Sequence, residues 1–479
     1  MNCNNSWRYL LLLLLSSSSI TTTTNAFVVV PSSKHASSSL RLEAQKNTNL
    51  MDSVKQTMAT LFVTSSLMGL TWASPAIVAP FQHDSPAIVR AVEKASGSGS
   101  RVNKDAESLL RYGLPIKNKE VRQLQTTIET IQNDVQSKRK LAAMDDVKKT
   151  RSQMTKNNKA MIAACRNPAD CTQILKDMDE VIDPLVQNIQ TSMDTFNGSE
   201  QERSAIDKAY AGQQKLAISL TALQEAMVPE NYSTPVPKEY DDLPQLQGRA
   251  TVEFTISKPE KGQVFDINGV NFDTAKMIMI IDGYAAPVTS GNFVELVQKG
   301  FYTNMKIQRS DGFVVQTGDP DGPAVGYVAP PNKSVGAGKQ GERLIPLELM
   351  LTKDYPSKPP LYEVTMDEEG RGGEATVLPF SSYGAMGWAR EEYSPNTGSS
   401  QFFWLLFDSD LTPAGKNLLD GNYPCFGYVV KGADFLNDMK EGDIITSAKV
   451  TKGAENLKLP GKAKAPAAEA VAVASEEAT

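Results

Sequence analysis

Histidine, the side chain most often used in acid–base chemistry, is confined to one end of this sequence. The 479-residue chain has two histidines, His35 and His83, and both lie in an N-terminal stretch that we expect to be removed. Without imidazole, the rest of the chain cannot build a Ser-His-Asp or Cys-His nucleophile, a histidine zinc site or a histidine general base. Any reaction must therefore proceed without histidine, and the sequence predicts neither a metal nor a cofactor.

Three segments of the C-terminal half carry an arginine, aromatic residues and glutamines in a fixed order. They are residues 301–309, ending in Ile-Gln-Arg, residues 312–319, which contain Gly-Phe-Val-Val-Gln, and residues 389–403, which end in Ser-Ser-Gln-Phe-Phe. At these residues the sequence resembles a cyclophilin. The resemblance continues through 286–293 and through Leu-Asp-Gly and Phe-Gly within 419–427, and it spans residues 248–452.

The resemblance implies an eight-stranded antiparallel barrel capped by helices and the cis/trans isomerisation of X-Pro peptide bonds. Rotation about a peptide bond faces a barrier of ~18–20 kcal/mol because the C–N bond has double-bond character. A donor aimed at the prolyl nitrogen favours the twisted state, and a guanidinium is a charged donor of fixed geometry. By similarity to the family, the catalytic residue is Arg309 and the substrate-binding residues are Phe313, Gln316, Ala389, Gln401, Phe403, Leu418, Leu419 and Tyr423.

These residues divide into three implied roles. Phe313, Phe403 and Leu419 form the apolar proline pocket, and the two glutamines orient the substrate backbone. The backbone of Ala389 lines the neighbouring subsite.

The sequence departs from the family pattern around the arginine. Cyclophilins usually have Phe-His-Arg where this chain has Ile-Gln-Arg309, and the connection to Phe313 is one residue shorter. A slip of one residue on a strand exchanges its faces, so either Arg309 or Gln308 faces the pocket. Leu418 replaces a usual tryptophan and Tyr423 a usual histidine, which predicts weak turnover.

The sequence between Asp319 and Gly387 is much longer than in most cyclophilins. It contains Asp-Glu-Glu at 367–369 and Arg-Gly-Gly at 371–373. We interpret this insert as a flexible lid or, with somewhat better support, as a solvated loop.

Two folded units follow the N-terminal segments, so the fold class is multidomain α and β. Apolar residues at steps of three and four predict an antiparallel bundle of four or five helices over 103–228, with a kink near Pro184. One apolar stripe runs from Ile174 to Phe196. A proline-rich linker is predicted at 229–247, the barrel at 248–452 and a disordered tail at 453–479.

The N-terminus has the composition of targeting signals. Residues 1–26 are typical of a secretory signal peptide, and 27–79 of a plastid transit segment followed by a second apolar signal. The arrangement resembles tripartite targeting to the thylakoid lumen in algae with complex plastids. A membrane anchor is the alternative, because residues 57–82 carry no charge.

Two cysteines lie close enough in sequence to pair. Cys165 and Cys171 flank Asn-Pro, a helix stop followed by a new helix start, so both side chains can face one tight turn. A disulfide and a pair of small buried residues are equally good interpretations. The absence of a nearby histidine argues against zinc.

The bundle and this cyclophilin variant together resemble a two-domain cyclophilin of the thylakoid lumen. That resemblance implies a factor that assists photosystem II assembly on lumenal loops of its subunits. The mature chain is acidic, which favours proline-containing protein clients over nucleic acid, and we expect it to be soluble or peripheral to the thylakoid membrane. The alternative is a catalytically weak or inactive chaperone or scaffold that uses its proline groove and bundle to hold partners.

Overall fold

The computed structural model describes residues 103–329, 336–406 and 417–461. The predicted targeting segments and the end of the tail lie outside these ranges. Among the helices described, none combines the length and the apolar character needed to cross a membrane.

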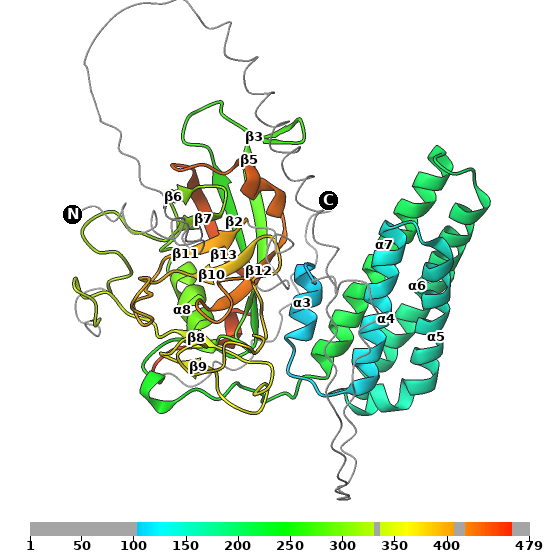
Figure 1. Cartoon of the computed structure of the whole chain (residues 1–479), viewed down its shortest axis with the longest axis horizontal. Helices are drawn as coiled ribbons and strands as arrows, with labels where there is room; N and C mark the ends of the chain where they lie inside the picture. Colours follow the sequence, from blue (N-terminus) through cyan, green and yellow to red (C-terminus); the bar gives the residue numbers. More distant parts are fainter. Residues whose placement is uncertain (1–102, 330–335, 407–416, 462–479) are drawn as a thin grey trace, which may run out of the picture. The chain divides into compact units, whose positions relative to one another are not determined.

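Four long helices form the predicted bundle (Figure 1). They are α4 (Lys119–Gln136), α5 (Lys140–Ala163), α6 (Pro168–Asp194) and α7 (Glu200–Ala226), preceded by the short α3 (Ala106–Tyr112). Asn118, Asn167 and Ser199 begin α4, α6 and α7, and each side chain accepts a hydrogen bond from a backbone N–H of the first turn. Such caps satisfy donors that have no partner within the helix.

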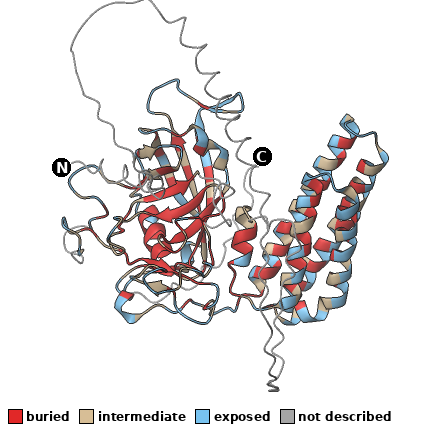
Figure 2. Ribbon diagram, in the orientation of Figure 1, coloured by how far each residue is buried: buried red, intermediate tan, exposed pale blue. Residues whose placement is uncertain are grey.

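The bundle core consists of the apolar stripes seen in the sequence. Figure 2 shows buried residues on the inward sides of the helices and exposed residues on their outer sides. Pro184 lies inside α6, which is one continuous helical segment. Phe196 was placed on the stripe of this helix, but α6 ends at Asp194 and Phe196 is 85% exposed. Because the helix ends at Asp194, the side chain of Phe196 no longer follows the apolar stripe and lies outside the core.

The C-terminal half forms one antiparallel eight-stranded sheet. Its strands, in spatial order, are β13 (Ile444–Lys452), β2 (Arg249–Ser257), β5 (Thr274–Asp282), β12 (Cys425–Lys431), β10 (Ala385–Trp388), β11 (Phe402–Leu405), β7 (Val314–Thr317) and β6 (Ile307–Ser310). The sheet curls until its edges meet: Lys306 bridges Ile444, and Ile307 donates its backbone N–H to the carbonyl of Asp443. Closure of this kind removes the exposed strand edges.

An aromatic cluster forms the barrel core, and helix α8 (Pro287–Gln298) packs its buried apolar residues into it. Phe254, Phe293, Phe402 and Trp404 are fully buried, with ring centroids 4.9–6.2 Å apart. Strand β2 alternates buried and half-buried residues along its length, as its sequence predicts.

The predicted boundaries of the linker and the tail are wrong at their inner ends. Strand β1 (Gln245–Leu246), placed in the linker, pairs with β14 (Leu457–Lys458), placed in the disordered tail. Leu246 is fully buried and Leu457 nearly so, and both belong to the barrel core. Two short segments that look unstructured alone are ordered here because each supplies the other's backbone partner.

The insert is not simply a solvated loop. Strands β8 (Glu348–Leu349) and β9 (Leu361–Tyr362) pair within it, and its leucines form a small buried cluster. The carboxylate of Glu348 accepts hydrogen bonds from the backbone N–H groups of Val288 and Thr289 at 3.1 and 2.9 Å, in the first turn of α8. The insert thus caps the barrel helix, because a carboxylate at a helix N-terminus satisfies its unpaired donors. A hairpin, β3 (Phe265–Ile267) and β4 (Val270–Phe272), completes the fold.

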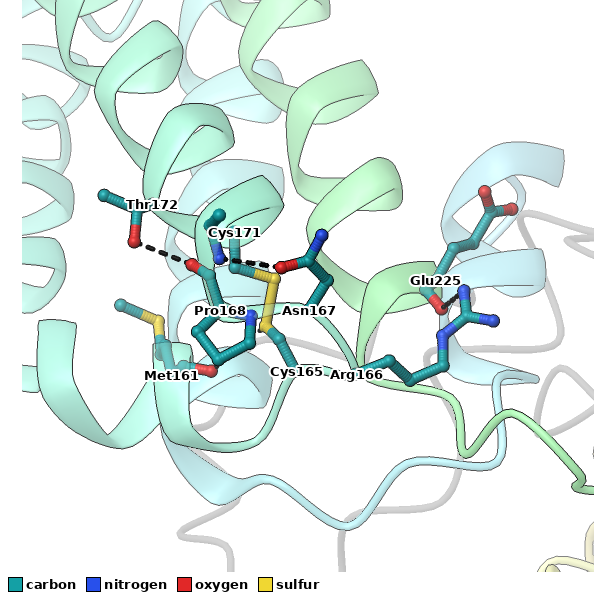
Figure 3. The surroundings of a disulfide bond; sticks show 9 residues. Met161, Cys165, Arg166, Asn167, Pro168, Cys171, Thr172 and Glu225 are labelled. Atoms are coloured by element: carbon teal, nitrogen blue, oxygen red, sulfur yellow. Dashed lines mark hydrogen bonds between the residues drawn. A yellow bond between two sulfur atoms is a disulfide. The ribbon is translucent and has the colours of Figure 1, made fainter.

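A disulfide joins Cys165 to Cys171 across the turn between α5 and α6 (Figure 3). The same turn is attached to the end of α7, since Arg166 donates its backbone N–H to the carbonyl of Ala226 and its side chain to that of Glu225. Of the two interpretations of these cysteines, the structure therefore supports the disulfide.

Removing this disulfide should weaken the bundle. The cysteines are six residues apart, and closing so short a loop is worth about 2 kcal/mol in chain entropy. We expect the Cys165→Ser/Cys171→Ser variant to lose about that much free energy of unfolding in chemical denaturation followed by circular dichroism. Dithiothreitol should destabilise the wild type equally and leave the variant unaffected. Equal stability of wild type and variant would contradict the prediction.

Candidate functional site

A bulge in strand β6 determines which way Arg309 faces. Ile307 pairs with Thr317 of β7, and Arg309 pairs with Gln316, so two steps along β6 match one step along β7. The extra residue is Gln308, whose side-chain amide donates to the carbonyl of Asp319 at 2.8 Å. Residues two apart normally share a face of a strand, but a bulge changes this. Ile307 therefore faces the barrel interior while Arg309 faces outward.

The sheet register brings the predicted site residues into one row on this outer face. Arg309 lies opposite Gln316, Gln316 opposite Phe403, and Phe403 opposite Gly387 of β10. Directly opposed residues of neighbouring strands point to the same side of a sheet. The alternate residues Thr317 and Phe402 point inward. Of the two alternatives left open by the sequence, the structure selects Arg309 for the outer face.

Two glutamines form a continuous chain of amide hydrogen bonds beside the arginine. Gln316 Nε2 donates to Gln401 Oε1 at 2.9 Å, and Gln401 Nε2 donates to the carbonyl of Val325 at 2.8 Å. The backbone N–H of Ala389 donates to the carbonyl of Gln401 at 3.0 Å, which places Ala389 next to this chain. The amides are thus held in fixed orientations and offer a polar edge for an extended peptide backbone.

The apolar part of the row is covered by neighbouring side chains. Phe403 is 3% exposed and stacks on Phe380 of the insert, with ring centroids 6.0 Å apart and planes at 18°. Tyr423 contacts Phe403 in an edge-on arrangement, also with ring centroids 6.0 Å apart. Leu419 belongs to the same cluster and is 5% exposed, whereas Phe313 is half-buried. The outer face therefore has its own small core.

Leu418 does not join the other predicted residues. Its side chain is 66% exposed, while Leu419 beside it is buried. Both residues lie in the turn at 417–423, in which Asn417 Oδ1 accepts the backbone N–H of Leu419 at 3.0 Å. Leu418 is therefore not part of this apolar cluster.

Charged groups surround Tyr423, where the family usually has a histidine. The guanidinium of Arg390 lies 4.6 Å from the centre of the Tyr423 ring and donates to the carbonyl oxygen of Asn422. Burial raises the pKa of Tyr423, while the charges of Arg390 and Arg309 act in the opposite direction. The phenol stays neutral at physiological pH, and the charge of Arg309 acts on it.

Two site residues were missed in the sequence. Asp311 accepts a hydrogen bond from Arg309 Nε at 2.7 Å and a second from its Nη2. Phe380, a residue of the insert, covers Phe403. The sequence did not indicate which residues this part of the insert would contact. The Asp-Gly pair after Arg309 was a visible turn signal, but nothing in the sequence near Phe380 pointed to the site.

Within the described ranges, no three or more His, Cys, Asp or Glu side chains are arranged to hold a metal ion. The buried thiol of Cys425, opposite Gly387, has its pKa raised to about 12 by burial. A thiol with such a pKa is a poor nucleophile. The chemistry available at this face is therefore that of hydrogen-bond donors and apolar contact.

Comparison with known proteins agrees with this geometry. Residues 269–456 match the model of the cyclophilin type peptidyl-prolyl cis-trans isomerases, and residues 105–228 match that of a CYP38-like, PsbQ-like domain. The chloroplastic peptidyl-prolyl cis-trans isomerase CYP38 of Arabidopsis thaliana is 38% identical over 74% of this chain and 76% of its own length.

A second relative, a putative thylakoid lumen peptidyl-prolyl cis-trans isomerase of Synechocystis, is 36% identical over 82% of this chain and 92% of its own length. These relatives place the chain in the thylakoid lumen of a plastid, as its N-terminal signals predict. The chain belongs to the cyclophilin-type peptidyl-prolyl cis-trans isomerases, in the group whose cyclophilin domain follows a PsbQ-like helical domain.

Proposed function

We propose that this chain accelerates the cis/trans isomerisation of X-Pro bonds in lumenal proteins, with Arg309 as the catalytic donor. The observation that carries the proposal is the row of Arg309, Gln316 and Phe403 on one face of three neighbouring strands. This row combines a charged donor, a backbone-orienting amide and an apolar ring. Isomerisation requires those three elements and no proton transfer.

The proposed mechanism follows from what holds the amide planar. The barrier of ~18–20 kcal/mol reflects donation of the prolyl nitrogen lone pair into the carbonyl group. Arg309 donates a hydrogen bond to that nitrogen as it becomes pyramidal, an interaction that is stronger in the transition state than in the planar substrate. Gln316 and Gln401 hold the flanking backbone, and Phe313 packs against the pyrrolidine ring.

We further propose that the clients are lumenal loops of photosystem II subunits and that the chain assists their assembly. The match of the bundle to a PsbQ-like domain supports this setting. Proline-containing peptides from such loops should shift the nuclear magnetic resonance (NMR) signals of Phe313 and Gln401. Peptides with alanine in place of proline serve as the control.

One observation favours the second candidate function, a lumenal chaperone or scaffold with little turnover. Phe403 is almost fully buried beneath Phe380, and a proline ring must displace or share that contact. In this case the groove binds clients without accelerating isomerisation. Exchange NMR distinguishes the two candidates, because it measures binding and interconversion of the same peptide.

Replacing the arginine tests the catalytic proposal. We expect Arg309→Ala to lower kcat/KM by about 10²-fold, as the loss of one transition-state donor does elsewhere, and Arg309→Lys to retain part of the rate. The measurement is exchange NMR on an Ala-Pro peptide, and Arg203→Ala, at an exposed position of α7, is the matched control. A rate for Arg309→Ala equal to that of the wild type, at unchanged peptide affinity, would leave only the scaffold function.

The position of Phe403 should depend on Gly387. A Cβ atom on Gly387 would lie 2.1 Å from Cζ of Phe403, so Gly387→Ala must move the ring. We expect a loss of about 1–3 kcal/mol in the free energy of unfolding, with the ring displaced in a crystal structure. Gly373→Ala is the control, since a Cβ there meets open space. A variant as stable as wild type, with an unmoved ring, would refute this dependence.

A further inference from the structure

The carboxylate of Asp311 serves two partners with its two oxygens. Oδ1 accepts the backbone N–H groups of Phe313 and Val314, each at 3.0 Å, and so shapes the turn between β6 and β7. Oδ2 accepts Nε of Arg309 at 2.7 Å and also its Nη2. Asp311 therefore shapes the turn and also holds the guanidinium of Arg309 on the side of that turn.

Arg309 and Asp311 form an ion pair. Burial acts to raise the pKa of Asp311, but the backbone N–H groups and the Arg309 guanidinium outweigh it, so the pKa lies below its usual value. The side chains of Arg309 and Asp311 are 23% and 39% exposed, so solvent screens the attraction only in part. A negative charge in contact with a guanidinium weakens the field that this group presents to a third partner.

In the proposed function, the third partner is the prolyl nitrogen of the substrate. This inference therefore rests on the proposed function. We propose that Asp311 is a positioning residue that restrains Arg309: it holds the guanidinium toward the β6–β7 turn and offsets its charge, and so keeps isomerisation slow. Asp311 itself touches no substrate. It acts through the arginine, and its removal should release activity.

The turn and the restraint can be separated by one substitution. Asp311→Asn keeps an oxygen that accepts from Phe313 and Val314, but it replaces the anionic oxygen that holds Arg309 with an amide nitrogen. We expect kcat for an Ala-Pro peptide to rise about two- to five-fold, the scale of a partly exposed ion pair. KM should stay unchanged, because the released charge acts mainly on the transition state.

A double-mutant cycle shows whether the effect passes through the arginine. In an Arg309→Ala background, Asp311→Asn should change nothing. Asp266→Asn is the matched control, because Asp266 Oδ1 accepts the backbone N–H of Gly269 at 2.7 Å and shapes the β3–β4 turn in the same way. Its kcat should equal that of the wild type. The Nε–H resonance of Arg309, recorded on the full chain, should shift in Asp311→Asn and not in Asp266→Asn.

The outcomes separate this inference from the proposed function. A wild type that is active, with an Asp311→Asn variant of equal or lower kcat, overturns the restraint and leaves the proposed function standing. A gain that persists without Arg309 also overturns it. An inactive wild type with an active Asp311→Asn variant refutes turnover by the native chain and supports the restraint. If neither is active, both fail.

Discussion

The extra residue in strand β6 is the constraint on which the site depends. In a regular strand, an inward Ile307 would place Arg309 inward as well, and a guanidinium inside an aromatic barrel core would lose most of its hydration. The bulge at Gln308 instead lets Ile307 face inward while Arg309 faces outward. Because Gln308 donates to the carbonyl of Asp319, the bulge is tied to the segment that follows β7. The charged donor reaches the outer face because one polar side chain fixes an irregularity in the pairing.

The outer face also explains why the central strands contain so few polar residues. All four residues of β10 and of β11 are buried, because the aromatic core lies on one side of the sheet and the cluster around Phe380 and Phe403 on the other. A sheet covered on both faces has continuous apolar strands. The insert thus takes over part of the surface that would otherwise be open. What remains accessible is the side of the row that carries Arg309 and the two glutamines.

The sequence predicted the parts of this protein whose signals are local. Helical stripes, the alternation of β2 and the ordered motifs around Phe313 and Phe403 each lie within one short segment, and the structure contains the bundle and the barrel that they imply. The pairing of β1 with β14 could not be predicted, since it joins segments more than two hundred residues apart. The contact between Phe380 and Phe403 could not be predicted either, because it joins the insert to strand β11. The direction of Arg309 was left open because a bulge depends on the register of two strands, and one strand alone does not reveal it.

A site without histidine keeps the same charge state over a wide pH range. The phenol of Tyr423, with its pKa raised mainly by burial, remains neutral at mildly acidic and neutral pH. Asp311 has a folded-state pKa below its ordinary value of 3.8, so it contributes stability above that value and loses it only as the pH falls through the lower folded-state pKa. Neither Tyr423 nor Asp311 changes charge between mildly acidic and neutral pH. The proposed interaction therefore does not rely on a histidine, the side chain whose charge changes near neutral pH.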